Sequence, residues 1–121
     1  MLFDTNILIQ YLNGEEKIVT QLNNWRLEGR ACIVSSISVA ETLSLDTLSE
    51  SDTKKVQSFL KTFVSVPFDD QIAFMAATIR RNYGLGLPDA AIAATATMLN
   101  VPLITQDKQF KKLKEITVVD I

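Results

Sequence analysis

The sequence predicts an α/β fold, in which a short parallel sheet lies between two layers of helices in a three-layer α/β/α arrangement. Short apolar runs typical of strands alternate with longer segments of helical periodicity. No two neighbouring strand runs are joined by a hairpin turn, so consecutive strands are expected to be connected through helices and to run parallel. A chain of 121 residues that is 47% hydrophobic can build one core but not two, so we expect one domain over residues 1–121.

Five short apolar runs are the predicted strands. The first, Leu2–Phe3, leads directly into Asp4. The second, over residues 31–35, is a continuous apolar run of the kind found in strands buried on both faces. The other three are Val64–Pro67, Pro102–Thr105 and Ile116–Val119.

The segments between these runs carry apolar residues at helical spacing. A helix is expected directly after Asp4, and a later helix is expected to open at Ser38, where Ser38 and Glu41 match the S-x-x-E capping box. The remaining predicted helices are Glu15–Glu28, Ser51–Phe63, Asp69–Tyr83, Pro88–Asn100 and Asp107–Lys114. The small side chains of the alanine-rich Pro88–Asn100 helix predict that it lies close against the sheet.

The amino-acid composition excludes several kinds of catalytic and metal site. The chain has no histidine, which excludes Ser-His-Asp and Cys-His catalysis and histidine-ligated zinc. Its net charge of −2 gives no overall attraction to nucleic acid. The single cysteine, Cys32, is expected to be a buried thiol in a reducing cytoplasm. Neither a membrane-spanning run nor a signal peptide is visible.

Four acidic residues stand where predicted strands end or the following helices begin: Asp4, Glu41, Asp89 and Asp107. Each could simply stabilise a helix start, because acids are favoured at N-caps and in first turns. In a parallel sheet, however, the carboxyl ends of all strands lie at one edge, where ligands bind in open α/β folds. We therefore expect the four carboxylates to converge.

Convergence of four carboxylates calls for a counter-charge. Two like charges 4 Å apart repel by about 4 kcal/mol at an effective dielectric constant near 20. An all-oxygen cluster without histidine favours Mg²⁺ or Mn²⁺ over zinc. Such an ion activates water and neutralises charge in phosphoryl transfer.

Four motifs together resemble the PIN domain family, and in particular the VapC-type toxins of bacterial and archaeal toxin–antitoxin pairs. They are Asp4-Thr5-Asn6 after an apolar start, Glu41 within Ser-Val-Ala-Glu-Thr-Leu, the Leu87–Ala96 segment around Asp89, and Leu103-Ile104-Thr105-Gln106-Asp107. The resemblance covers the whole chain in order.

The resemblance implies a Mg²⁺- or Mn²⁺-dependent endoribonuclease that is held inactive by a cognate antitoxin and forms a homodimer. Carried over by position, Asp4, Glu41, Asp89 and Asp107 are the catalytic and metal-binding residues. Thr5 and Asn6 would support the site. Many relatives carry a further acid just before the phenylalanine of the last motif, where this chain has Gln109.

The sequence leaves two other functions possible and does not decide the role of the basic surface near Asp107. An aspartyl-phosphate phosphatase would use Asp4 as its nucleophile, but its usual Asp-x-Asp motif ends here in Asn6. A PIN-like binding module without catalysis is the other alternative. Lys108 and Lys111 are candidate contacts for the RNA backbone, or else belong to a solvated helix face.

Overall fold

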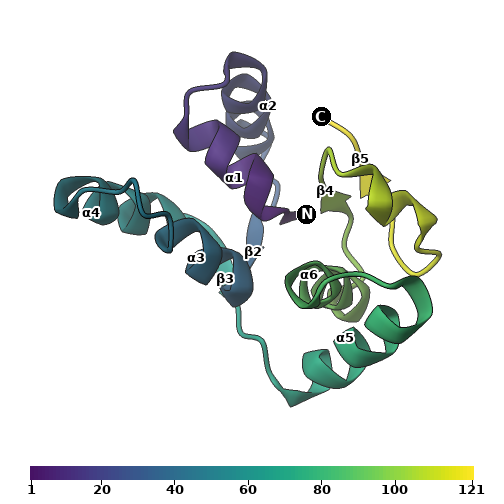
Figure 1. The fold of residues 1–121 in the computed structure, drawn as a ribbon. Helices are drawn as coiled ribbons and strands as arrows, with labels where there is room; N and C mark the ends of the chain where they lie inside the picture. Colours follow the sequence, from purple (N-terminus) through teal and green to yellow (C-terminus); the bar gives the residue numbers. More distant parts are fainter.

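The computed structural model describes residues 1–121 and contains one five-stranded, fully parallel sheet (Figure 1). The spatial order of the strands is β3-β2-β1-β4-β5. Leu2 of β1 is in register with Ile33 of β2 on one side and with Leu103 of β4 on the other. The strands are β1 Leu2–Phe3, β2 Ile33–Ser35, β3 Val64–Val66, β4 Leu103–Ile104 and β5 Val118–Val119. The predicted fold class is thus confirmed.

Six α-helices and one 3-10 helix, η1, connect and cover the strands. Their bounds are α1 Thr5–Leu12, α2 Glu16–Leu27, α3 Ser36–Leu43, α4 Glu50–Leu60, α5 Asp70–Tyr83, α6 Leu87–Leu99 and η1 Lys108–Lys112. These positions follow the predicted periodicity to within a few residues, except that α3 begins before Ser38. No helix has the length and apolar character needed to cross a membrane.

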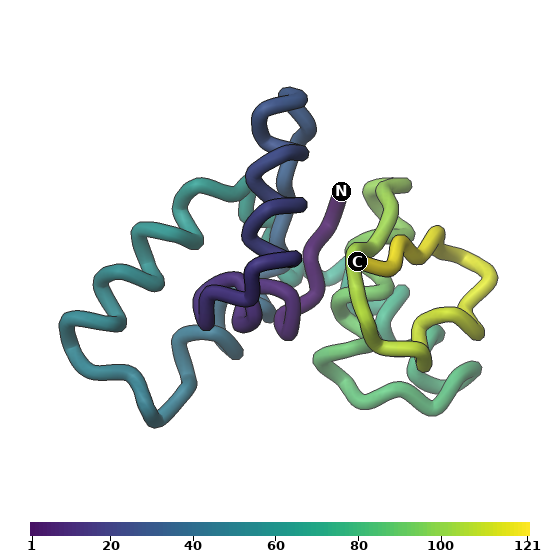
Figure 2. Tube along the Cα trace, turned by 90° about the horizontal axis from the view of Figure 1, so that it is seen from above, coloured from purple at the N-terminus to yellow at the C-terminus, as the bar shows by residue number.

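The two faces of the sheet bury two separate cores, because successive side chains on a strand point to opposite faces. Leu2 and Leu103 pack with α5 and α6, whereas Phe3 and Ile104 pack with α1, α2 and α4. Figure 2 shows the N-terminal strand running between these two groups of helices. Trp25 lies in the second core beside Phe3.

Helix α6 is the most deeply buried helix of the fold. Every residue from Ala90 to Ala96 is buried. Its small side chains let it lie between α5 and the sheet, as expected from its composition. Thr95, also fully buried, donates its hydroxyl to the Ala91 carbonyl one turn earlier at 2.7 Å. The close packing of α6 fixes its first turn, which carries Asp89, relative to the sheet edge.

We predict that Phe3→Ala destabilises the domain by about 3–5 kcal/mol, the usual cost of removing a buried phenylalanine. The Phe3 ring is fully buried, 6.0 Å from Trp25 and 5.7 Å from Phe63 between ring centroids. Phe74→Ala is the matched control, because Phe74 is 74% exposed and should cost little. Urea unfolding measures both variants, and equal losses would contradict this account of the core.

Candidate functional site

The four acids come from four elements at the carboxyl edge of the sheet. Asp4 follows β1, Glu41 lies in α3 after β2, Asp89 lies in the first turn of α6, and Asp107 follows β4. The strand order reverses between β1 and β4, the place where open α/β sheets bind ligands. The topology therefore brings the predicted residues to one edge.

Asp4 is a buried carboxylate held by the neighbouring strand. Its side chain is 4% exposed, and its Oδ2 accepts a hydrogen bond of 2.7 Å from the Thr105 hydroxyl. Asp4 occupies the N-cap position of α1, but its side chain makes no capping hydrogen bond. The alternative in which Asp4 serves to cap a helix is therefore not supported by its contacts.

Burial and mutual repulsion raise the pKa values of two of the acids. The pKa of Asp4 is raised from 3.8 to about 6, chiefly by burial. The Thr105 hydrogen bond lowers this pKa, and the charges of Asp89 and Asp107 contribute to raising it. The pKa of Asp89 is also raised, by burial first and then by the charges of Asp107 and Glu41. Asp4 is thus repelled by Asp89 and Asp107, and Asp89 is repelled by Asp107 and Glu41.

Glu41 is held by a chain of hydroxyl groups. The Thr5 hydroxyl oxygen lies 2.8 Å from both Glu41 Oε1 and Ser38 Oγ. A hydroxyl has one proton and a carboxylate only accepts, so Thr5 donates to Glu41 and Ser38 donates to Thr5. Ser38 is fully buried, and Thr5 is almost so. The structure thus places Thr5 against a member of the acidic cluster.

The capping box predicted at Ser38 and Glu41 is wrong. Helix α3 begins at Ser36, and its N-cap is Ser35, whose hydroxyl accepts from the Ile37 amide at 3.1 Å. Ser38 and Glu41 therefore lie within the helix, three residues apart on one face. A capping box is instead formed at the start of α4 by Ser49 and Asp52.

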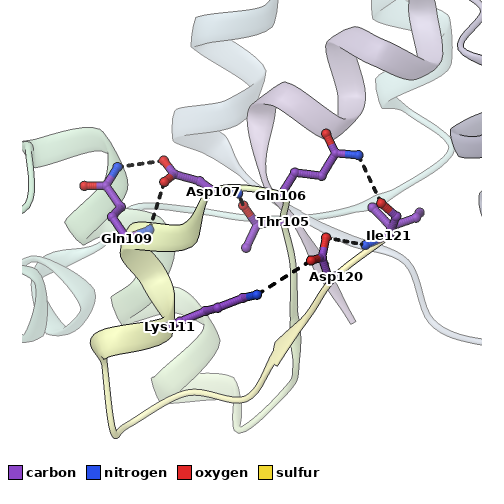
Figure 3. Close-up of polar contacts among 7 residues, drawn as sticks. All are labelled: Thr105, Gln106, Asp107, Gln109, Lys111, Asp120 and Ile121. Carbon is purple, nitrogen blue, oxygen red and sulfur yellow. Dashed lines mark hydrogen bonds and ion pairs between the residues drawn. The ribbon is translucent and has the colours of Figure 1, made fainter.

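Asp107 both caps a helix and belongs to the cluster. Its Oδ1 accepts from the Gln109 backbone amide at 3.0 Å, and its Oδ2 accepts from the Gln109 side-chain amide at 2.7 Å (Figure 3). The same amide nitrogen donates to Asp89 Oδ2 at 3.1 Å. Gln109 therefore links two of the predicted site residues.

Sequence reasoning missed two contacts in this cluster. Thr105 lies at the end of a predicted strand and within the motif that ends at Asp107, but neither pattern predicts that its hydroxyl reaches Asp4. Gln109 stands where many relatives carry an acid, and its bonds to two carboxylates depend on the distance between α6 and η1. Neither contact could be read from spacing alone.

The residue types at this edge fit a hard divalent cation, because all four acids offer carboxylate oxygens as ligands. A cation would also offset the repulsion between neighbouring carboxylates. No three acidic side chains converge on a common point, however. The donor set thus matches Mg²⁺ or Mn²⁺ in chemistry, while a shared ion would require its side chains to move together.

The surroundings of the cluster are polar and partly basic. A hollow of about 340 Å³ beside Asp107 is lined by Asn6, Gln10, Gln106 and two further residues. Lys108 is exposed next to Asp107. Lys111 forms an ion pair with Asp120 near the C-terminus (Figure 3), with 3.6 Å between Nζ and Oδ2.

Comparison with known proteins places the chain in a family. A model of the PIN domain matches residues 1–116. The fold resembles a chain of a toxin–antitoxin complex from Klebsiella pneumoniae, with 31% sequence identity, a TM-score of 0.84, and coverage of 98% of this chain and 94% of that chain. The protein therefore belongs to the PIN domain family.

Two further solved structures share the fold. One is VapBC2 from Rickettsia felis bound to a promoter DNA fragment, with 22% identity, a TM-score of 0.85, and coverage of 99% of this chain and 97% of that chain. The other is FitAcB from Neisseria gonorrhoeae, with 28% identity, a TM-score of 0.76, and coverage of 97% and 94%. A search of curated protein sequences found no match.

The raised pKa of Asp4 predicts an unusual pH dependence. Because the folded state holds this proton more tightly than the unfolded state, ionised Asp4 lowers stability as pH rises from about 4 to 6. Asp4→Asn should therefore be more stable than the wild type at pH 7, by about 2–3 kcal/mol. At pH 4 the difference in unfolding free energy between the variant and the wild type should nearly vanish. Urea unfolding in EDTA at both pH values measures it, and a variant less stable at pH 7 would contradict the assignment.

Proposed function

We propose that this protein is a metal-dependent endoribonuclease and the toxin of a toxin–antitoxin pair. The observation that carries the proposal is the position of Asp4, Glu41, Asp89 and Asp107 at the carboxyl edge, where the charges of neighbouring acids contribute to the raised pKa values of Asp4 and Asp89. Membership of the PIN domain family supports it. The reaction proposed is hydrolysis of RNA phosphodiester bonds.

Under this proposal the four carboxylates hold Mg²⁺ or Mn²⁺. When bound, the ion would supply an activated water and neutralise charge on the phosphate. The protein's own contribution is positioning. Thr105 orients Asp4, and Thr5 orients Glu41, each through a hydroxyl held in a buried setting. Such outer contacts fix carboxylate oxygens before an ion arrives.

The RNA would approach the exposed side of the cluster. Lys108 is exposed beside Asp107 and makes no ion pair, so we propose it as a backbone phosphate contact. Lys111 is a weaker candidate because Asp120 lies 3.6 Å away. Asn6 borders the hollow next to Asp107 and would support the site from there.

The proposed protein partners are a cognate antitoxin and a second copy of this chain, both in the cytoplasm. The Klebsiella structure is a toxin–antitoxin complex, and the Rickettsia structure is VapBC2 bound to a promoter DNA fragment. An apolar hollow of about 400 Å³ between α1 and α4, lined in part by Ile9, Leu12 and Val56, is the surface that we propose for the antitoxin. The expected homodimer is measurable by sedimentation.

We predict that Asp4→Asn and Asp89→Asn each reduce RNA cleavage by roughly 100-fold or more, because each removes one anionic ligand at nearly constant shape. Cleavage of a structured RNA in Mg²⁺ or Mn²⁺ is the assay, with the melting temperature measured alongside. Asp70→Asn is the matched control, since Asp70 is an exposed first-turn acid of α5 far from β1 in the chain.

The same assay separates the alternatives. A wild-type protein that cleaves no RNA but hydrolyses a small phosphomonoester would indicate a phosphatase. A protein that does neither, yet binds a partner, would indicate a binding module. Full cleavage by both site variants would refute the assigned roles.

We also predict that the antitoxin inserts an arginine among Asp4, Asp89 and Asp107. A guanidinium bonds carboxylates as a bidentate fork and would compete with the metal for the same oxygens. Changing that arginine to alanine should weaken inhibition, and raising Mn²⁺ should relieve it. Inhibition that is indifferent to both changes would rule out this mode of control while leaving the ribonuclease proposal intact.

A further inference from the structure

The side-chain amide of Gln109 lies between two carboxylates of the cluster. Its Nε2 is 2.7 Å from Asp107 Oδ2 and 3.1 Å from Asp89 Oδ2. The backbone amide of the same residue donates to the other oxygen of Asp107. Gln109 is itself exposed, so its side chain can swing away without disturbing the core.

The direction of the Gln109 amide follows from its neighbours. A carboxamide has two N–H donors at one end and a carbonyl acceptor at the other, whereas an ionised carboxylate only accepts. The reverse orientation would place the carbonyl oxygen of Gln109 against two anionic oxygens. The donor end therefore faces Asp89 and Asp107, with one N–H available to each acid.

A donor in this place has the electrostatic role of a cation. It puts partial positive charge between two carboxylates that share one nitrogen as their partner and so lie close together. The amide also occupies the lone pairs of the Asp89 and Asp107 oxygens that point into the space between these two side chains. A cation shared by Asp89 and Asp107 would need those same lone pairs, so the amide and the ion exclude each other.

We propose that Gln109 is a positioning residue whose amide bridges Asp89 and Asp107 until a divalent cation displaces it, so that Gln109 weakens cation binding. This rests on the proposed function in that the cation that displaces the amide is the metal of that site.

The test is Mn²⁺ binding to the RNA-free protein, measured by calorimetry or by the electron paramagnetic resonance signal of free Mn²⁺. Gln109→Leu removes both donors at similar size, so it should bind Mn²⁺ about threefold to tenfold more tightly than the wild type. The rise in melting temperature on adding Mn²⁺ should be correspondingly larger. Gln109→Asn, whose amide is one methylene shorter, should fall between the two.

Gln106→Leu is the matched control. Gln106 is also an exposed glutamine with two side-chain hydrogen bonds, but its partners are Gln10 and the carbonyl of Ile121. Its removal leaves the acids untouched and should leave the Mn²⁺ affinity within about twofold of the wild type. A tighter affinity in this variant as well would overturn the specific role of Gln109.

The direction of the change in Mn²⁺ affinity distinguishes the possible outcomes. Weaker Mn²⁺ binding by Gln109→Leu would overturn the proposal and make Gln109 a metal ligand through its carbonyl oxygen. Unchanged binding, or no binding by any variant, would also overturn it. If Gln109→Leu tightens binding that Asp89→Asn abolishes, but the wild type cleaves no RNA, the inference stands and the proposed ribonuclease function fails.

Discussion

The hydrogen bond from Thr105 to Asp4 joins the ends of the two central strands at the point where the strand order reverses. It spans 101 positions of the chain, and the rest of the candidate site is arranged around it. Because β1 and β4 are parallel neighbours, the residues that follow them emerge at the same edge. The hydroxyl therefore reaches Asp4 directly, and Asp107 follows Thr105 within two residues.

This arrangement places negative charge where it is costly to the folded state. Asp4 is almost completely buried, and the hydrogen bond from Thr105 only partly offsets the loss of water. Asp89 and Asp107 add repulsion. A protein that retains such a cluster gives up stability at neutral pH in return for a site that attracts cations, as is common at functional sites.

The two hydrophobic cores hold in place the strands and helices that form the carboxyl edge of the sheet. Helices α1, α2 and α4 cover one face of the sheet, and α5 and α6 cover the other. The alanine side chains of α6 permit the close approach that brings Asp89 within bonding distance of Gln109. Larger side chains there would move the first turn of α6 outward and separate Asp89 from the other acids.

Much of the fold follows from the sequence alone, because strands and helices arise from local periodicity. The apolar pair Leu2–Phe3 and the alanine-rich segment beginning near Pro88 each have the predicted structure. The position of the four acids at one edge was also predictable, since the strand ends of a parallel sheet lie together, although no three of the acids converge on one point. The order of the elements and the resemblance of the motifs are enough to place these acids at that edge.

The contacts within the site depended on the tertiary structure. Ser38 and Glu41 have the spacing of a capping box, yet the start of α3 at Ser36 turns them into neighbours inside a helix. The bonds of Gln109 and Thr105 connect segments distant in the chain, and their lengths depend on how closely α6, η1 and the strands pack. Sequence determined which side chains stand at the edge. Packing decided which of them touch, because hydrogen bonds require distances that no local pattern encodes.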